Sequence, residues 1–248
     1  TERKQAEAML RVALHREQEL SEMKSRFVAM AAHEFRNPLS VILANVELLQ
    51  QMWRRQPPEI VDRRLAVIEA QVTGLNEIVR SLLELSRIQS GAVAFRPVRL
   101  NLAELCRDVI RQLQLAPSDA PSVCYEPPPA PVWVQGDPVL LQRIIHNIIA
   151  NARKYTLNAM PVEVTLATTA ADVQLSVTDH GIGIEPSDLR QIFEPFHRGA
   201  NVQDIPGTGL GMAIVKQLIE LHQGRIRIES EVGVGTTVTL ELPAASAA

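Results

Sequence analysis

A histidine next to a glutamate, His33-Glu34, stands in the stretch MAAHEFRNPLS, which has helical periodicity. A carboxylate that accepts a hydrogen bond from one imidazole nitrogen fixes the tautomer and makes the other nitrogen a better nucleophile. Asn37 follows His33 by one turn and can hold a water or a phosphoryl oxygen over the same helix face. Such a pair is also common on ordinary helix surfaces, so these residues alone leave a nucleophilic histidine and a solvated face as alternatives.

A second polar group recurs along HNIIANARKYT, where Asn147, Asn151, Lys154 and Tyr155 are spaced by four, three and one residues. The two asparagines share a helix face. Amide oxygens suit Mg²⁺, which usually takes the rest of its ligands from water and substrate phosphates. Lys154 would add a point charge for those phosphates. The alternative is a polar helix face without a ligand.

Two glycine-rich segments follow. Asp179 precedes Gly181 and Gly183 at the end of an expected strand, where its carboxylate can accept a hydrogen bond from an exocyclic amine of a base. The second segment, Gly207-Thr208-Gly209-Leu210-Gly211, leads into an apolar helix, and backbone N–H groups at such a turn can hold phosphate. It is neither a Walker A sequence nor a dinucleotide-binding fingerprint, because the spacing differs.

The first part of the chain must position His33. A heptad seam runs from Met9 to Met30, and a second from Val61 to Leu82 has apolar residues at all seven positions. Pro57 and Pro58 separate the two, which predicts a helical hairpin. Because two helices cannot bury both faces alone, homodimerisation into a four-helix bundle is expected, and a hairpin packed on the rest of its own chain is the alternative.

After a linker at residues 91–97 the pattern changes to an α+β domain. Helices are predicted from Asn101 to Leu115, from Asp137 to Tyr155 and from Leu210 to Leu221. Period-two strands are predicted at residues 162–166, 173–177, 225–229 and 237–241. The expected architecture is a mixed sheet with helices layered on one face.

Composition excludes several classes of protein. The 248 residues carry 25 Lys and Arg against 28 Asp and Glu, so a net charge of −3 gives no electrostatic basis for binding nucleic acid. Two cysteines cannot form a disulfide framework, and no apolar run is long enough for a membrane span. The chain starts at Thr1 within an apparent helix, which leads us to expect a piece of a longer protein.

These segments, in this order, resemble the sensor histidine kinases of two-component systems. MAAHEFRNPLS is similar to the phosphoacceptor box, HNIIANARKYT to the N box, DHGIG and GTGLG to the two glycine boxes, and IFEPFHR to the F box. The resemblance implies a signalling helix and dimerisation/phosphotransfer domain at residues 1–90, the linker 91–97, an ATP-binding domain at 98–244 and a tail at 245–248. That second domain would be an α/β sandwich of the type shared with gyrase, the Hsp90 chaperones and MutL.

The resemblance also implies roles for individual residues. His33 would be the phosphoacceptor, Glu34 the general base and Asn37 a residue that positions water for a phosphatase reaction. Asp179 would contact the adenine amino group, Asn151 would bind Mg²⁺, and Phe193 and Phe196 would anchor a lid over ATP. The remaining nucleotide-binding positions would be Asn147, Lys154, Tyr155, Gly181, Gly183, Gly207, Thr208, Gly209, Leu210, Gly211 and Thr236.

The implied reaction is autophosphorylation of His33 by ATP and transfer to an aspartate on a response regulator. The alternative, an ATPase clamp like the Hsp90 and MutL relatives, lacks a use for MAAHEFRNPLS. A homodimer, a response regulator and a sensor upstream of Thr1 are the expected partners. The fragment is expected in the cytoplasm, whether the whole protein is membrane-anchored or soluble.

Overall fold

The computed structural model describes residues 28–51, 57–115, 120–156, 160–169, 171–202, 205 and 207–245. The chain divides into two compact units, Thr1–Val79 and Arg80–Ala248, so the division falls within helix α2 (Pro58–Gln89). The predicted seam before residue 28, part of the predicted lid and residues 246–248 of the predicted tail lie outside the described residues. The domain boundary predicted at residues 91–97 stays a prediction.

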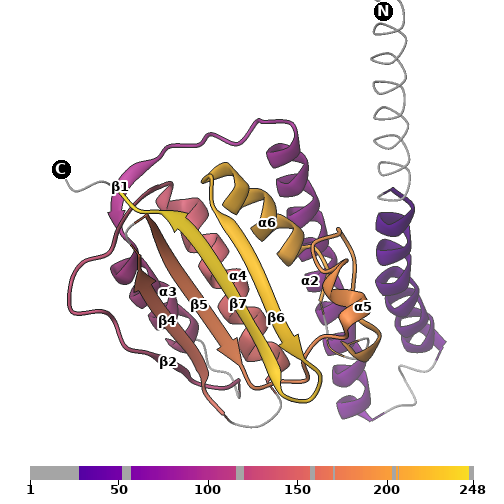
Figure 1. Cartoon of the computed structure of the whole chain (residues 1–248). Helices are drawn as coiled ribbons and strands as arrows, with labels where there is room; N and C mark the ends of the chain where they lie inside the picture. The colour runs from indigo at the N-terminus through magenta and orange to yellow at the C-terminus, as the bar shows by residue number, and fades with distance from the viewer. Residues whose placement is uncertain are drawn as a thin grey trace, which may run out of the picture. The chain divides into compact units, whose positions relative to one another are not determined.

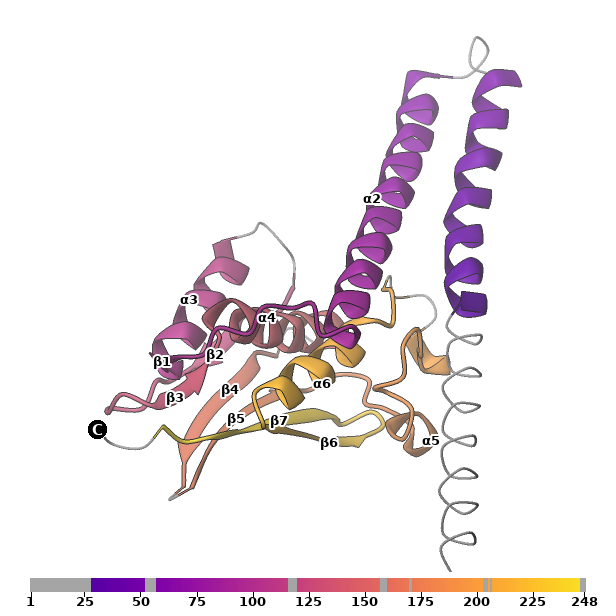
Figure 2. The ribbon, with the colours of Figure 1, turned by 90° about the horizontal axis from the view of Figure 1, so that it is seen from above.

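The first unit contains the predicted helical hairpin (Figure 2). Residues 28–51 are helical throughout, and α2 begins at Pro58, where a first-turn proline costs no helix hydrogen bond. Arg64 of α2 donates a hydrogen bond to Asn45 Oδ1 at 3.3 Å and so ties the two helices together. None of the helices formed by the described residues is long and apolar enough to cross a membrane.

Three of the seven predicted seam positions on α2 are exposed in the part of the chain that the structure describes. Leu65, Val72 and Val79, which recur every seven residues, are 46%, 44% and 42% exposed. The alternate seam positions are half-buried: Val61, Ile68, Leu75 and Leu82. The hairpin therefore leaves one apolar edge in solvent, where each side chain forgoes about 1.5–3 kcal/mol of burial free energy at most.

The second unit is built on a mixed sheet (Figure 1). In the part that the structure describes, this sheet has five strands in the order β2-β4-β5-β7-β6, with β2 parallel to β4 and the other pairs antiparallel. Its strands are β2 (Val123–Tyr125), β4 (Val162–Thr168), β5 (Asp172–Asp179), β6 (Arg225–Glu231) and β7 (Gly235–Pro243). A smaller antiparallel pair joins β1 (Val98–Asn101) to β3 (Trp133–Gly136).

The longer helices of this unit lie on one face of the sheet (Figure 2). They are α3 (Leu102–Leu115), α4 (Pro138–Tyr155) and α6 (Gly211–Leu221), and two short turns, α5 (Pro186–Leu189) and η2 (Ala200–Val202), connect β5 to α6. The four predicted strands and three predicted helices are confirmed. Strands β1, β2 and β3 were not predicted, because three or four residues are too few to show a period-two pattern.

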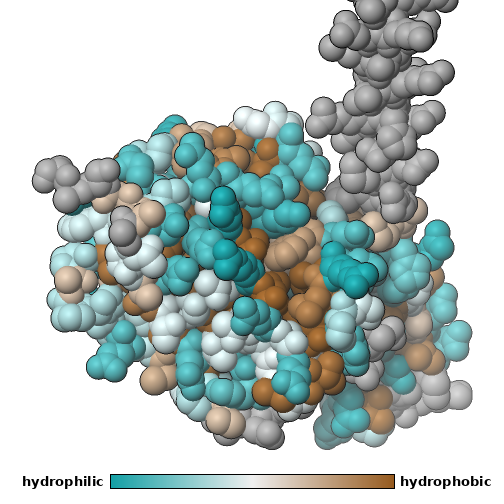
Figure 3. Space-filling view, in the orientation of Figure 1, coloured by the Kyte–Doolittle hydropathy of each residue, from teal (hydrophilic) through white to brown (hydrophobic). Residues whose placement is uncertain are grey.

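Alternation along β5 decides which side chains face the helices. Val173, Leu175 and Val177 are buried, and the next residue of that face is Asp179, 7% exposed. On the other face, the Ser176 hydroxyl pairs with Thr239 and the Thr178 hydroxyl with Thr237 across to β7. That face is largely hydrophilic in Figure 3. The alternation therefore places the Asp179 carboxylate on the apolar face of the sheet that packs against α4.

The first turn of α4 is held from two sides. Asp137 caps the helix by accepting from the Val139 N–H at 3.0 Å, and its second oxygen accepts from the Arg96 N–H at 2.9 Å. His222, 4% exposed at the end of α6, accepts from the Asp137 N–H and directs Nδ1 at the Leu218 carbonyl. These bonds fix α4 relative to α6 and to the chain that enters the unit.

The last turns of α2 also belong to this second unit. Leu85 and Ile88 are buried, and Glu84 forms an ion pair with Arg143 of α4. Burial lowers the pKa of Arg143 from its usual value.

Burial of Asp179 makes the stability of this unit depend on pH. Desolvation raises the pKa of this carboxyl above 3.8, and hydrogen bonds from the Gly181 and Thr236 N–H groups and the nearby His180 only partly offset that rise. Between 3.8 and the raised pKa the unfolded chain loses this proton while the folded chain keeps it. The contribution of Asp179 to stability therefore falls as the pH rises through this interval.

We predict that Asp179→Asn gains stability relative to the unsubstituted chain as the pH rises from about 3.8 through the raised pKa of Asp179. Urea unfolding of the nucleotide-free chain at a series of pH values measures the difference between the two curves. Asp172→Asn, at the exposed start of the same strand, controls for the loss of a negative charge. A difference for Asp179→Asn that is flat or that shrinks with pH would contradict this account.

Candidate nucleotide site

The polar face of α4 carries the predicted phosphate-binding side chains. Asn147, Asn151, Lys154 and Tyr155 are each half-buried, whereas the intervening Ile148, Ile149 and Ala152 are buried against the sheet and neighbouring helices. Lys154 Nζ lies 3.3 Å from the Tyr155 hydroxyl and 4.8 Å from the centre of its ring. No carboxylate among the described residues pairs with Lys154, so its charge is available to an anion.

The first glycine segment closes directly on the end of α4. Gly181 forms a β-bridge with Thr156, and the Ile182 N–H donates to the Tyr155 carbonyl at 3.3 Å. A Cβ at position 181 would lie 2.2 Å from that carbonyl oxygen, so only glycine fits. The Gly181 N–H in turn donates to Asp179 Oδ1 at 3.0 Å. The carboxylate is thereby fixed beside the last turn of the asparagine-bearing helix.

The second glycine segment runs over the same helix face. A Cβ at Gly207 would meet Lys154 Nζ at 2.5 Å, and one at Gly211 would lie 4.0 Å from Asn151 Nδ2. Backbone of residues 207–211 therefore approaches both polar side chains closely. Leu210 is fully buried, so it can contribute only backbone groups, and its N–H donates to the Thr208 hydroxyl at 3.3 Å.

Phe196 joins the F box to this segment. Its side chain is 8% exposed, its φ is 65°, and its N–H donates to the Gly209 carbonyl at 3.1 Å. Gly209 also has a positive φ, and a Cβ there would lie 2.7 Å from the Phe196 carbonyl carbon. Phe193 lies with its ring centre 5.5 Å from Lys216 Nζ of α6. The segment between the F box and the second glycine segment therefore starts and ends at the contact between Phe196 and Gly209.

Several residues that the sequence did not single out hold these loops. The Ser230 hydroxyl accepts from the Ile184 N–H and pairs with Thr236 at 2.8 Å, and Asn201 donates to the Gly183 carbonyl at 3.2 Å. His197 pairs with Asp188 at 3.2 Å. Their partners are backbone atoms or residues at least six positions away, so no local pattern could have found them.

Thr236 lies next to the buried carboxylate. It pairs with Asp179 in the β5–β7 register and its side chain shares the helix-covered face. The structure therefore brings together residues of the N box, both glycine boxes, the F box and the closing strand within one unit. Asn147 lies one turn before Asn151, without a contact to either glycine segment among the described residues.

His33, Glu34 and Asn37 lie in the other compact unit, on the helix at residues 28–51. The His33 side chain is 67% exposed, and its Nδ1 is 3.7 Å from Glu34 Oε1. Asn37 is exposed one turn further along. The imidazole is thus accessible, and the Glu34 carboxylate lies on its Nδ1 side.

The donor set of the second unit suits a nucleotide with a hard cation. The described residues include no cluster of three or more His, Cys, Asp or Glu side chains that could hold a metal. A cation beside the Asn151 amide would need further oxygen ligands, and phosphate supplies them. Lys154, which has no carboxylate partner in the described part of the chain, and the backbone amides suit the triphosphate, and the buried Asp179 carboxylate suits the base.

Two protein families match the chain. Residues 136–246 match the family described as "Histidine kinase-, DNA gyrase B-, and HSP90-like ATPase". Residues 23–91 match the "His Kinase A (phospho-acceptor) domain". The ATPase match covers α4, both glycine segments and the closing strand, and it implies that this unit binds ATP.

Curated relatives are sensor kinases. Sensor histidine kinase RcsC of Salmonella typhi is 31% identical over 237 residues, which cover 91% of this chain and 24% of RcsC. Histidine-protein kinase/phosphatase MprB of Mycolicibacterium paratuberculosis is 33% identical, covering 88% and 42%, and sensor-like histidine kinase SenX3 of Mycobacterium tuberculosis is 32% identical, covering 88% and 53%. The chain thus spans between about a quarter and about half of these relatives.

Solved structures share the fold. A mycobacterial sensor histidine kinase MprB structure aligns with a TM-score of 0.51 at 28% identity, over 61% of this chain and all of that one. Histidine kinase ThkA, solved in complex with response regulator protein TrrA, aligns with a TM-score of 0.69 at 24% identity, over 88% of this chain and 61% of that one. With a phospho-acceptor match, an ATPase match and these relatives, the chain belongs to the sensor histidine kinases.

Proposed function

We propose that this chain phosphorylates itself on His33 with ATP and passes the phosphoryl group to an aspartate of a response regulator. The observation that carries the proposal is the convergence of Asp179, the glycine segment 207–211 and the polar face of α4 in one unit, with an exposed His33-Glu34 pair in the other. Phosphoryl transfer depends chiefly on positioning and charge stabilisation, which these groups can supply.

ATP would lie with its base at Asp179 and its phosphates at the second glycine segment. The Asp179 carboxylate, held by the Gly181 N–H, would accept from the adenine amino group, and Thr236 and Gly183 would border the base. Lys154, Tyr155 and Asn147 would face phosphates and ribose, and the N–H groups of residues 207–211 would donate to the phosphates. Asn151 would hold Mg²⁺ with phosphate oxygens, and the ion would offset their negative charge.

In the reaction itself, His33 Nε2 would attack the γ-phosphorus in line, forming a P–N bond as the bond to the bridging oxygen breaks and ADP leaves. Glu34 would accept the Nδ1 proton, because its carboxylate faces that nitrogen. A response-regulator aspartate would then displace the imidazole from phosphorus and form an acyl phosphate. Asn37, exposed beside His33, would position water for the phosphatase reaction, in which the acyl phosphate on the response regulator is hydrolysed. The relative MprB carries both kinase and phosphatase in its name.

A second copy of the chain would complete the first unit. The exposed seam edge of Leu65, Val72 and Val79 requires an apolar partner, and an identical seam supplies one with the same seven-residue repeat. We therefore propose a homodimer in which two hairpins form a four-helix bundle. The domain limits at residues 1–90 and 98–244 remain part of this proposal, since the two compact units divide within α2.

His33→Gln is expected to abolish labelling of the chain by [γ-³²P]ATP, because the amide cannot attack phosphorus, while leaving nucleotide binding within about twofold. The label on the unsubstituted chain should be acid-labile and base-stable. Filter-bound radioactivity measures the labelling, and a fluorescent ATP analogue measures nucleotide binding. Label that persists in His33→Gln would refute the assignment. Steady ADP release without any phosphoprotein would favour the ATPase clamp instead.

Asn151→Asp is expected to slow labelling by about a thousandfold. A carboxylate about 4 Å from a phosphate oxygen costs about 4 kcal/mol at an effective dielectric constant of about 20. Initial rates of His33 labelling at saturating Mg²⁺ measure the loss. Gln142→Glu adds the same charge to α4 more than two turns away and serves as the matched control. Equal rates for the two variants would remove Asn151 from the metal site.

Val72→Glu is expected to weaken the dimer by at least a hundredfold, because it would bury an unpaired carboxylate in the seam. Sedimentation equilibrium over a concentration series measures the dissociation constant. Ala70→Glu, exposed on α2 outside the seam, should leave that constant unchanged. A dimer that survives Val72→Glu at the same concentrations, or an unsubstituted chain that stays monomeric, would contradict the proposed bundle.

A further inference from the structure

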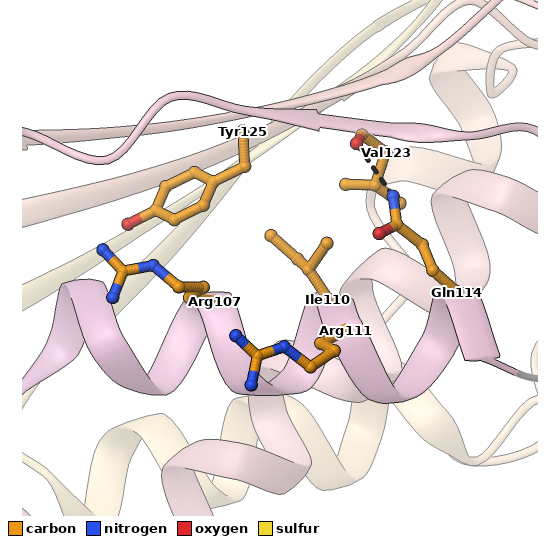
Figure 4. Close-up of a pocket in the computed structure, with 6 residues that line it drawn as sticks. All are labelled: Arg107, Ile110, Arg111, Gln114, Val123 and Tyr125. Atoms are coloured by element: carbon orange, nitrogen blue, oxygen red, sulfur yellow. Dashed lines mark hydrogen bonds between the residues drawn. The ribbon is translucent and has the colours of Figure 1, made fainter.

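A polar pocket whose lining includes none of the nucleotide motifs lies between α3 and the edge strand β2 (Figure 4). It has a volume of about 250 Å³ and is lined by Arg107, Ile110, Arg111, Gln114, Val123 and Tyr125. Figure 4 shows Tyr125 and Arg107 at one end, Gln114 at the other, and Ile110 pointing from α3 toward β2 between them. None of these residues has a part in the phosphotransfer reaction, so the pocket needs its own explanation.

The ends of the pocket are fixed. The Tyr125 hydroxyl donates to the Ala103 carbonyl at 3.2 Å, and Gln114 Nε2 donates to the Val123 carbonyl at 3.1 Å. Burial raises the pKa of Tyr125 to about 12, so the phenol keeps its proton for that bond. Ile110 and Val123, 6% and 8% exposed, form an apolar floor. The site is therefore preformed.

The rim of the pocket is cationic. Arg107 and Arg111 are exposed and lie one turn apart on α3. Among the described residues neither guanidinium forms an ion pair, although Glu104 and Asp108 share their helix, and no acidic residue lines the pocket. Two arginines without carboxylate partners beside a polar pocket favour an anionic ligand.

The free edge of β2 lies at the same place. Among the residues that the structure describes, β2 is paired only with β4, and the Val162 N–H donates to the Ser122 carbonyl. Because backbone groups of successive residues point to opposite sides of a strand, Val123 and Tyr125 direct their N–H and C=O groups away from β4. The Val123 carbonyl accordingly accepts from Gln114, but neither outward N–H has a partner among the described residues. Such an edge can accept another strand.

The spacing of Arg107 and Arg111 favours a ligand in the extended, strand-like conformation. Four residues of helix advance about 6 Å, and alternate residues of an extended strand are about 6.5–7 Å apart. A strand added to β2 would place every second side chain on the α3 side of the sheet, as Val123 and Tyr125 already are. Acidic residues at alternate positions of that strand would each reach one arginine.

We propose that the β2 edge and the Arg107–Arg111 rim form a docking site for an extended acidic segment of a partner protein. The segment adds to β2 by accepting main-chain hydrogen bonds from the Val123 and Tyr125 N–H groups and pairs two alternate carboxylates with the arginines. The site lies outside the nucleotide motifs, and its occupation does not depend on the phosphotransfer reaction.

The test uses a fluorescein-labelled peptide of sequence Ser-Glu-Val-Glu-Val-Glu-Ser, blocked at both ends, and the full chain. Fluorescence anisotropy should show saturable binding at low salt that falls at least tenfold in the variant R107Q/R111Q. Two changes in the peptide separate charge from strand addition. Glutamine in place of glutamate, and N-methylation of alternate amides, should each weaken binding at least tenfold.

Arg225→Gln, an exposed arginine on the opposite edge strand β6, is the matched control and should bind the peptide as the unsubstituted chain does. His33 labelling should be unchanged in R107Q/R111Q, so loss of peptide binding is distinguishable from failure of the kinase assignment. Absence of saturable binding, equal binding by R107Q/R111Q, or equal binding of the N-methylated peptide would overturn the proposal. So would stronger binding to phosphatidylserine vesicles than to the peptide, which would assign the arginines to a membrane surface.

Discussion

The contact between the end of α4 and the loop after β5 is the constraint on which the nucleotide unit depends. The bridge from Thr156 to Gly181 and the bond from the Ile182 N–H to the Tyr155 carbonyl join a helix carrying amides and a lysine to a strand ending in a carboxylate. The absence of a side chain at Gly181 permits this approach. This contact places the Asp179 end of β5 beside the last turn of α4.

Polar groups in this unit fall into two kinds. Asp137 and His222 each have several hydrogen bonds, and these bonds fix the first turn of α4. Lys154, in contrast, has no carboxylate partner among the described residues, and the Asp179 carboxyl is buried at a cost that raises its pKa. Proteins tolerate such costs where a ligand compensates them. The contrast between groups that hold α4 in place and the charged Lys154 and buried Asp179 thus separates the scaffold from the ligand site.

The two units differ in how they bury apolar surface. The sheet and its helices enclose a complete core, from Leu102 to Leu242, within one chain. The hairpin leaves its seven-residue repeat half covered, and a helix with a regular apolar edge is a specific surface, since only a partner with the same repeat can cover it along its length. The exposed His33 lies on the other helix of this hairpin.

The sequence by itself determined the long helices, the four long strands and the family, because heptads, period-two runs and five motifs in order are local signals. Tertiary structure alone decided what no local pattern contains. Three short strands gain their backbone partners only from residues distant in the chain, such as β1 from β3. Ser230 and Asn201 hold the loops of the site through hydrogen bonds to backbone atoms far along the chain. The Leu210 side chain is buried in the core. The pocket at Arg107 and Arg111 exists only because β2 ends the sheet beside α3, a position set by the packing of the whole unit.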